Sequence, residues 1–316
     1  MPDVCYLFKM QAKFHPSRRD FIRTGTLLLT GMYALPAFAA NRYQPKLSFS
    51  TLGCPDWDFD KITAFAAAHG YQGLEIRGIQ REMDLPKAPI FQSAAGRAQT
   101  LARMKEKKLH FVGLGSSCTL HFKEAAKRQQ QLEDGKRFID LAEQLNCPYI
   151  RVFPNNFPKE QSREETMELI KSGLVELAEH ARGSKVEVLM ETHGDLVKTA
   201  DLEELMMAVK NSKIGLIWDI SNMWTITGEA PSMVYLQLKK YIRHVHVKDA
   251  VKENGKLRYT FLGQGEVPVF EGLDLLARDR YRGYLSFEWE KLWHPEIAEP
   301  EAALADYPQA IKKHFL

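Results

Sequence analysis

Acidic residues and histidines recur at the ends of four consecutive apolar segments in the second half of the chain. Glu191 and His193 follow one such segment, and Asp219 and Asn222 follow the next. The last two segments carry polar residues at the same relative position, namely His244, His246 and Lys248, then Ser286, Glu288 and Glu290. Carboxylates and imidazoles are the side chains that bind divalent metals. The repeated pattern therefore predicts a metal site if the four segments lie side by side.

Each of these residues alone has an ordinary structural explanation. A histidine in a strand is more often a hydrogen-bonded core residue than a ligand, and a terminal Asp is more often a helix cap. Burying Glu191, Asp219 and Glu288 together without a cation would, however, cost roughly several kcal/mol per unpaired ion. One divalent cation resolves that conflict. An oxygen-rich ligand set with one imidazole favours Mn²⁺, with Mg²⁺ or Zn²⁺ as alternatives.

The alternation of faces along a strand decides which residues act together. His244, His246 and Lys248 share one side of their segment, as do Ser286, Glu288 and Glu290. Glu290 is therefore an alternative to Glu288 as a ligand, and we favour Glu288. We interpret His244 as a core residue or as a support for the ligands.

These residues converge only if the segments form one closed sheet. Eight short segments rich in Val, Ile and Leu alternate with segments of helical periodicity. We predict strands at residues 47–52, 73–76, 110–114, 149–153, 186–191, 214–219, 242–247 and 284–288. We predict helices at residues 59–69, 94–107, 123–145, 163–181, 200–209 and 233–241, with a loop or hairpin at 252–267 before a short helix near 270–277. This alternation predicts an α/β fold, a single (β/α)8 barrel over residues 46–316.

The alternative architecture, an open doubly wound sheet, would place a glycine-rich phosphate turn after its first strand. Residues 51–55, Thr-Leu-Gly-Cys-Pro, are no such turn. The motif Gly263-Gln264-Gly265 lies late in the chain and lacks the strand-to-helix context. We therefore expect no nicotinamide or flavin.

The first forty residues differ from the rest. Ser17-Arg18-Arg19-Asp20-Phe21-Ile22 precedes a moderately apolar run at 27–38 that ends in small residues. The run is too short to span a hydrocarbon core of about 30 Å. We interpret residues 1–40 as a twin-arginine signal, which predicts a periplasmic or otherwise exported protein with no stable membrane insertion after cleavage. An uncleaved signal acting as an anchor and an amphipathic helix are the alternatives.

The chain as a whole has ordinary globular composition. Its 316 residues are 45% hydrophobic and 26% charged, with a formal net charge of +3. That charge is too small for the concentrated basic field that nucleic-acid binding requires, so we expect no nucleic-acid partner.

The motifs themselves resemble a known family. Glu191 with His193, Asp219 in Trp-Asp-Ile-Ser-Asn, His246 in His-Val-His-Val-Lys-Asp, and Glu288 after Gly-Tyr-Leu-Ser-Phe resemble the xylose isomerase-like TIM barrel superfamily. This sugar phosphate isomerase/epimerase group includes ketose epimerases and inosose dehydratase. Leu74-Glu75-Ile76-Arg77 looks like the family's early Glu-containing motif. The resemblance implies that the metal ligands are Glu191, Asp219, His246 and Glu288. It also implies that Glu191 and Glu288 are the catalytic proton carriers.

The resemblance leads to an expected activity. We expect a sugar isomerase or epimerase that transfers a proton next to a carbonyl through an enediolate stabilised by the metal. His193, Asn222, Lys248 and Glu75 are the expected substrate-binding residues, although Lys248 has the alternative of pairing with Asp249. Many epimerases have His where this chain has Asn222. The expected partner is a small-molecule sugar, and relatives are often dimers or tetramers, so a homo-oligomer is possible.

Two other functions compete with this one. The same enediolate can expel a substituent, which would make the protein a lyase or dehydratase acting on a keto-sugar or keto-glycoside. The third hypothesis is a non-catalytic barrel that binds a sugar. Trp57, Trp224 and Trp293 lie near strand ends, where we expect core packing, with stacking on sugar rings as the alternative.

Overall fold

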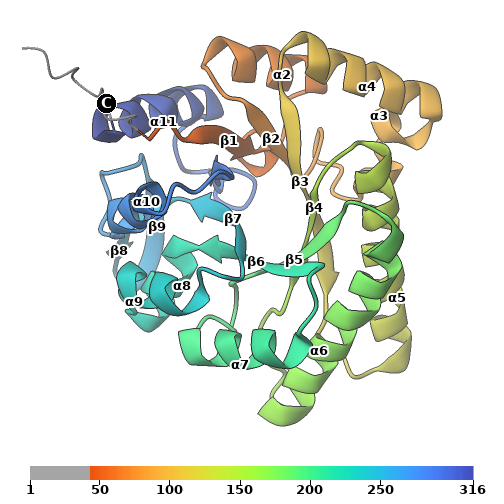
Figure 1. Ribbon diagram of the computed structural model, residues 1–316. Helices are drawn as coiled ribbons and strands as arrows, with labels where there is room; N and C mark the ends of the chain where they lie inside the picture. Colours follow the sequence, from red (N-terminus) through yellow and green to blue (C-terminus); the bar gives the residue numbers. More distant parts are fainter. Residues whose placement is uncertain (1–42, 316) are drawn as a thin grey trace, which may run out of the picture. The chain divides into compact units, whose positions relative to one another are not determined.

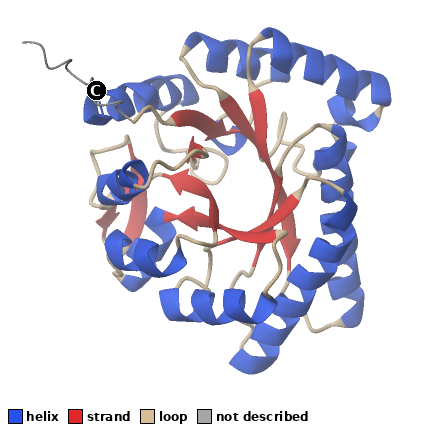
Figure 2. Ribbon diagram, in the orientation of Figure 1, coloured by secondary structure: helices blue, strands red, loops and turns tan. Residues whose placement is uncertain are grey.

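Eight parallel strands close into a barrel in the computed structural model, which describes residues 43–315 (Figure 1). Around the barrel the strands follow the order β1-β10-β7-β6-β5-β4-β3-β2. Figure 2 shows helices surrounding the strands on the outside. The predicted (β/α)8 barrel is confirmed. The interpreted export signal, residues 1–40, lies outside the described residues.

The strands lie where the apolar segments predicted them, within one or two residues except at the end of β3. Their bounds are β1 Lys46–Ser50, β2 Gly73–Ile76, β3 His110–Thr119, β4 Tyr149–Phe153, β5 Glu187–Glu191, β6 Ile214–Asp219, β7 Ile242–Val247 and β10 Tyr284–Phe287. Strands covered on both faces must be apolar, which is why this signal was strong. Between β7 and β10, an antiparallel hairpin forms from β8 Asp249–Glu253 and β9 Lys256–Thr260.

The helices cover the barrel between successive strands. Their bounds are α2 Phe59–Ala68, α3 Pro89–Gln92, α4 Ala94–Glu106, α5 Ala125–Gln144, α6 Arg163–His180, α7 Thr199–Val209, α8 Ile220–Thr227, α9 Pro231–Leu238, α10 Val269–Arg278 and α11 Pro300–Phe315. Side-chain caps fix several starts, as where Asp58 accepts a hydrogen bond from the backbone N–H of Lys61. The sequence predicts neither α3, α8 nor α11. The first residues of α8 carry the polar pattern that the sequence analysis assigns to the end of β6.

Gly115 on β3 leaves space inside the barrel for two large polar side chains, one that follows β2 and one on β4. A Cβ atom on Gly115 would lie 2.8 Å from Cδ of Arg77 and 3.3 Å from an Nη atom of Arg151. Both arginines are buried; Arg77 directly follows β2, Arg151 lies on β4, and these two strands flank β3. The absence of a side chain at Gly115 thus lets two guanidinium groups approach each other at the mouth of the barrel.

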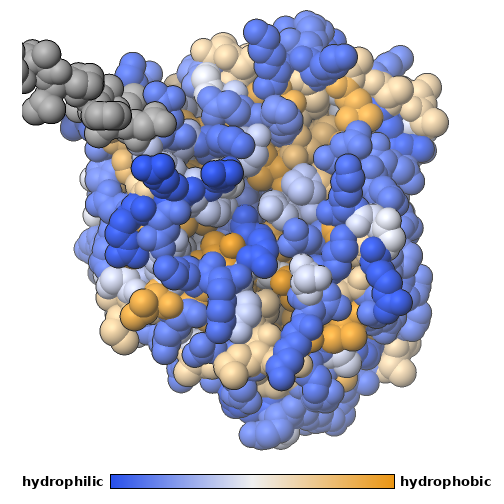
Figure 3. Space-filling model, in the orientation of Figure 1, coloured by the Kyte–Doolittle hydropathy of each residue, from blue (hydrophilic) through white to orange (hydrophobic). Residues whose placement is uncertain are grey.

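The face of the barrel seen in Figure 3 is mostly hydrophilic, and its hydrophobic residues lie in small groups. The apolar residues of the strands and of the inner helix faces form one buried core. Within residues 43–315 we found no helix with the length and apolar character needed to cross a membrane.

Candidate active site

Four of the predicted residues meet at the carboxyl ends of the strands. One ligand atom each from Glu191, Asp219, His246 and Glu288 lies within 4.8 Å of every other. Nδ1 of His246 is 3.3 Å from Glu288, 3.8 Å from Glu191 and 3.9 Å from Asp219. All four side chains are buried. We call these four residues the quartet. The structure brings Glu288, and not Glu290, into it.

Asp219 is both a helix cap and a member of the quartet. Its Oδ1 atom accepts a hydrogen bond of 2.8 Å from the backbone N–H of Asn222 and so begins α8. Its Oδ2 atom forms an ion pair with Lys248, at 2.8 Å from Nζ. The cap fixes the carboxylate so that its second oxygen points toward the other ligands.

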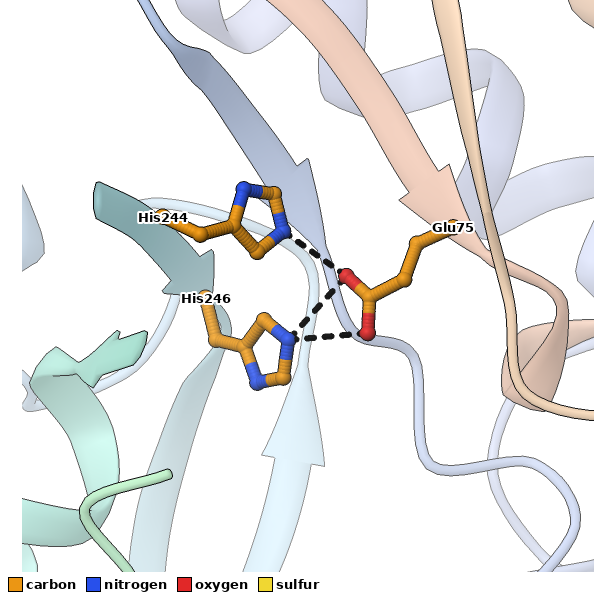
Figure 4. Close-up of side chains that lie close together, drawn as sticks. All are labelled: Glu75, His244 and His246. Carbon is orange, nitrogen blue, oxygen red and sulfur yellow. Dashed lines mark hydrogen bonds and ion pairs between the residues drawn. The ribbon is translucent and has the colours of Figure 1, made fainter. Parts of the chain in front are cut away.

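The carboxylate of Glu75 faces the imidazole rings of both His244 and His246, as Figure 4 shows. Nε2 of His246 lies 3.0 Å and 3.1 Å from the two carboxylate oxygens of Glu75, and Nε2 of His244 lies 2.9 Å from one of them. Ser286 donates a further hydrogen bond to the same carboxylate. A proton on Nε2 of His246 leaves Nδ1 free to bind a metal, so Glu75 selects the tautomer that a ligand needs.

The position of Glu75 beside His244 and His246 differs from the prediction that Glu75 contacts substrate. Its carboxylate is saturated by partners on β7 and β10, and it does not line the cavity described below. His244 supports the ligands, as we had interpreted it. Nothing in the sequence indicated that β2 and β7 would meet across the interior of the barrel.

Lys248 lies among three carboxylates. Its Nζ atom is 2.8 Å from Asp219, 2.7 Å from Glu288 and 2.8 Å from Glu290. The alternative pairing with Asp249 is wrong. Asp249 instead accepts hydrogen bonds from the backbone N–H groups of Ala250, Gly263, Gly265 and Val267. The Gly263-Gln264-Gly265 motif therefore encloses a carboxylate of its own chain.

Two cationic side chains of this site are not among the predicted site residues. Nη1 of Arg151, on β4, lies 3.0 Å from Glu191 and 3.5 Å from Glu288. Arg77 follows β2 and donates to the carbonyl of Gly115 and to the hydroxyl of Ser117. For Arg151 the sequence offered one indication, namely a charged residue in the middle of the otherwise apolar run Tyr-Ile-Arg-Val-Phe.

Charge in the buried site is unbalanced. Five carboxylates face three cationic side chains, and all eight are at most 8% exposed: Glu75, Glu191, Asp219, Glu288 and Glu290 with Arg77, Arg151 and Lys248. Burial lowers the pKa of His246, but Glu288 and Glu75 raise it well above its usual range, so without a metal ion its imidazolium leaves one negative charge in excess. When Nδ1 of His246 is deprotonated to bind a metal ion, the excess is two negative charges. One divalent cation would neutralise it, which lowers the cost of burying these groups.

The surrounding cations keep the two glutamates of the quartet ionised. Burial raises the pKa of Glu191, and Glu288 raises it too, but Arg151 contributes to a net pKa below the ordinary value. Burial also raises the pKa of Glu288, yet His246 and Lys248 hold it well below its usual range. In contrast, burial raises the pKa of Asp219 to about 6. Both glutamates can therefore accept a proton at neutral pH.

The quartet fits a divalent metal ion. It offers three carboxylates and one imidazole, and Nδ1 of His246 has no hydrogen-bond partner among the described residues, whereas Asp219 Oδ2 forms an ion pair with Lys248. Buried polar atoms without partners are rare unless a ligand or water satisfies them. Mn²⁺, Mg²⁺ and Zn²⁺ all accept this donor set.

A cavity of about 380 Å³ leads to the quartet. It is lined by Leu52, Arg77, Ser117, Thr119, Arg151, Phe153, Asn155, Glu191, His193, Asn222, Lys248, Tyr259, Glu288, Glu290 and Trp293. His193, Asn222 and Lys248, all predicted substrate contacts, lie on its surface. Burial lowers the pKa of His193, which favours a neutral imidazole there. Their contact with substrate stays a prediction.

The relatives of this chain come from one family. The family model described as Xylose isomerase-like TIM barrel matches residues 63–314. Inosose dehydratase of Clostridium botulinum (strain Eklund 17B / Type B) is 28% identical over 162 residues, which cover 45% of this chain and 52% of that protein. The chain thus spans about half the length of the curated relatives it matches.

Solved structures show the same barrel. The probable 3-DHS dehydratase AsbF from Bacillus anthracis has a TM-score of 0.68 at 20% identity, covering 84% of this chain and 98% of that chain. The 3-keto-D-glucoside 4-epimerase YcjR from E. coli has a TM-score of 0.67 at 14% identity, covering 86% and 99%. Identities this low show the fold alone. The family model, in contrast, covers most of the sequence, and this chain belongs to the xylose isomerase-like TIM barrel family.

Proposed function

We propose that this protein is a metal-dependent sugar isomerase or epimerase. It moves a proton at a carbon next to a carbonyl of an uncharged sugar or sugar derivative. The observation that carries this proposal is the placement of two buried, ionised glutamates in one cavity. Glu191 ends β5 and Glu288 follows β10, and β6 and β7 lie between these strands in the barrel.

Two bases on different walls suit a reaction that removes a proton and returns one. One glutamate accepts the proton from carbon, and the electron pair of the C–H bond moves toward the carbonyl oxygen to give the enediolate. A bound divalent ion supplies Lewis-acid stabilisation of the negative charge on the substrate oxygens. The second glutamate, or the first after the sugar has rearranged, returns a proton to carbon.

The cations of the cavity assist the same step. Arg151 contacts both glutamates, so it fixes their separation and favours their charged forms. His193 is placed to donate a hydrogen bond to a substrate oxygen, whereas the ammonium group of Lys248 lines the cavity paired with three carboxylates. The dipole of the His193 imidazole then faces the oxygen on which charge develops.

Charge balance favours an uncharged substrate. With one divalent ion the five buried carboxylates and three buried cations sum to neutrality when the imidazoles are neutral. A phosphate or carboxylate group on the substrate would then enter the buried site as uncompensated charge. We therefore infer a neutral keto-sugar over a sugar phosphate.

Elimination is the second candidate, and the named relatives favour it. Inosose dehydratase and a probable 3-DHS dehydratase are both among the proteins similar to this chain. In that reaction a glutamate takes the proton from carbon, the enediolate forms a carbon–carbon double bond, and the neighbouring C–O bond breaks. The Lys248–Glu290 pair is placed to protonate the departing oxygen.

Proton exchange distinguishes these reactions. We would incubate the Mn²⁺-loaded protein in D₂O with neutral ketoses, including D-fructose and D-tagatose, and follow them by NMR. Deuterium at the carbon next to the carbonyl in an intact sugar supports isomerisation or epimerisation, whereas a product with a new double bond supports elimination. Glu191→Gln and Glu288→Gln should abolish either signal, and Glu143→Gln, at an exposed helix position, should not. A metal-loaded protein that catalyses neither reaction on any sugar of the panel would contradict the proposal.

A further inference from the structure

Trp293 is exposed at the mouth of the active-site cavity. Its side chain is 58% exposed, although it lines the same cavity as Glu288 and Glu290. The core packing that we expected from the sequence is wrong for this residue. Trp57, Trp218 and Trp289 are at most 6% exposed, as is usual for so large an apolar side chain. Of the five tryptophans, all of which lie within the described residues, Trp293 is the most exposed.

The loop that carries Trp293 is nevertheless firmly held. The backbone N–H groups of Trp293 and His294 both donate to the carbonyl of Glu290, and that of Leu292 donates to the carbonyl of Leu52. Nζ of Lys291 lies 2.8 Å and 2.7 Å from the carbonyl oxygens of Pro295 and Ile297, and 2.9 Å from Glu299. The exposed ring is therefore presented from a fixed backbone, which lowers the entropy lost when a ligand binds to it.

A second aromatic side chain lines the cavity between its floor and its mouth. Tyr259, from β9, is half-buried, and its ring centre lies 5.9 Å from Nζ of Lys248 and 5.0 Å from the ring centre of His294. The wall thus changes from charged at Lys248 to aromatic at Tyr259 and Trp293. The three cationic side chains of the lining, Arg77, Arg151 and Lys248, are all at most 5% exposed.

We propose that Trp293, with Tyr259, forms a subsite for a second sugar ring, so that the substrate is a glycoside and not a free monosaccharide. This proposal rests on the proposed function, because it assumes that the reacting sugar ring lies at the quartet. The apolar C–H face of a sugar ring stacks on the face of an aromatic side chain, whereas the hydroxyl groups remain in water. A phosphate at the same place would find none of the cations of the cavity lining, since these lie at the floor.

Binding of ketoses with and without a second ring tests the subsite. We would titrate the Mn²⁺-loaded protein by calorimetry with D-fructose and with lactulose, turanose and isomaltulose, which carry a second ring at different positions of a fructose unit. At least one disaccharide should bind the wild-type protein about three- to tenfold more tightly than D-fructose, the range expected for one aromatic contact. Trp293→Ala should remove that advantage and leave the affinity for D-fructose unchanged. Trp293→Phe should retain most of it.

Leu236→Ala is the matched control, because Leu236 is a large apolar residue on α9 with 74% exposure and does not line the cavity. It should leave all four affinities unchanged. If no disaccharide binds the wild-type protein more tightly than D-fructose, or if Trp293→Ala keeps the advantage, the subsite is refuted. Stoichiometric metal and proton exchange with free ketoses would in that case still support the proposed function. A protein with neither stoichiometric metal nor proton exchange with ketoses would refute the proposed function itself.

Discussion

Glu75 joins two histidines through one carboxylate and so links the interior of the barrel to its mouth. Of the two histidines, only His246 belongs to the quartet, and it faces the other three members with its second ring nitrogen, Nδ1. The ligand geometry therefore depends on a residue that would not itself touch a metal ion. Asp219 also has two roles. One carboxylate oxygen caps the start of α8, and the other is a candidate metal ligand of the quartet.

Glu75→Gln should weaken metal binding without unfolding the barrel. The amide keeps the shape of the carboxylate but loses the charge that favours a proton on Nε2 of His246. We expect the Kd for Mn²⁺ to rise about 10- to 100-fold, the range found when such supporting partners are removed. Calorimetric titration measures it, with Glu143→Gln as the control. An unchanged Kd in Glu75→Gln would show that Glu75 does not orient the ligand.

Asp219 makes metal binding depend on pH. Burial raises its pKa to about 6, so a proton competes with the metal below that pH. A raised carboxyl pKa favours the folded metal-free protein at low pH, and this contribution is lost as the pH rises through about 6. Added Mn²⁺ should therefore raise Tm more at about pH 8 than at about pH 5.5. Equal gains in Tm at both pH values would contradict this role of Asp219.

At the scale of elements, β3 creates the space that the site needs. Gly115 lies against Arg77 and Arg151, whereas a Cβ atom on Gly113, in the same strand, would make only ordinary contacts of 3.7 Å or more. We expect Gly115→Ala to destabilise the protein by about 1–3 kcal/mol, because a buried guanidinium group must move. Gly113→Ala should be close to neutral. Denaturant unfolding of both variants measures the difference, and equal stabilities would contradict the close packing at Gly115.

The elements differ in how far the sequence predicts them. The eight barrel strands were predictable because burial on both faces requires apolar residues. The repeated strand ends were enough to predict that polar residues of four strands meet, and the family resemblance then selected Glu191, Asp219, His246 and Glu288 among them. The roles of Glu75 and Arg151 were not predictable, because they depend on which side chains meet across the barrel interior. The exposure of Trp293 depends on the path of a loop, which no periodicity encodes.

At the scale of the whole molecule, we propose that residues 1–40 direct export of the folded barrel. The paired arginines Arg18 and Arg19 are the feature that supports this proposal. The double variant Arg18→Lys/Arg19→Lys should remain in the cytoplasm, because the signal would no longer be recognised, and should still bind Mn²⁺. Cell fractionation followed by immunodetection measures it. Unchanged export of the double variant would contradict a twin-arginine signal.

The quartet should hold one divalent metal ion, and elemental analysis of the purified protein measures that ion. We would compare the wild type with Glu191→Gln and His246→Ala, and use Glu143→Gln as the control. The wild type and the control should contain about one Mn, Mg or Zn ion per chain, and the two quartet variants much less. A folded wild-type protein that contains no metal and does not bind added Mn²⁺, Mg²⁺ or Zn²⁺ would contradict the account.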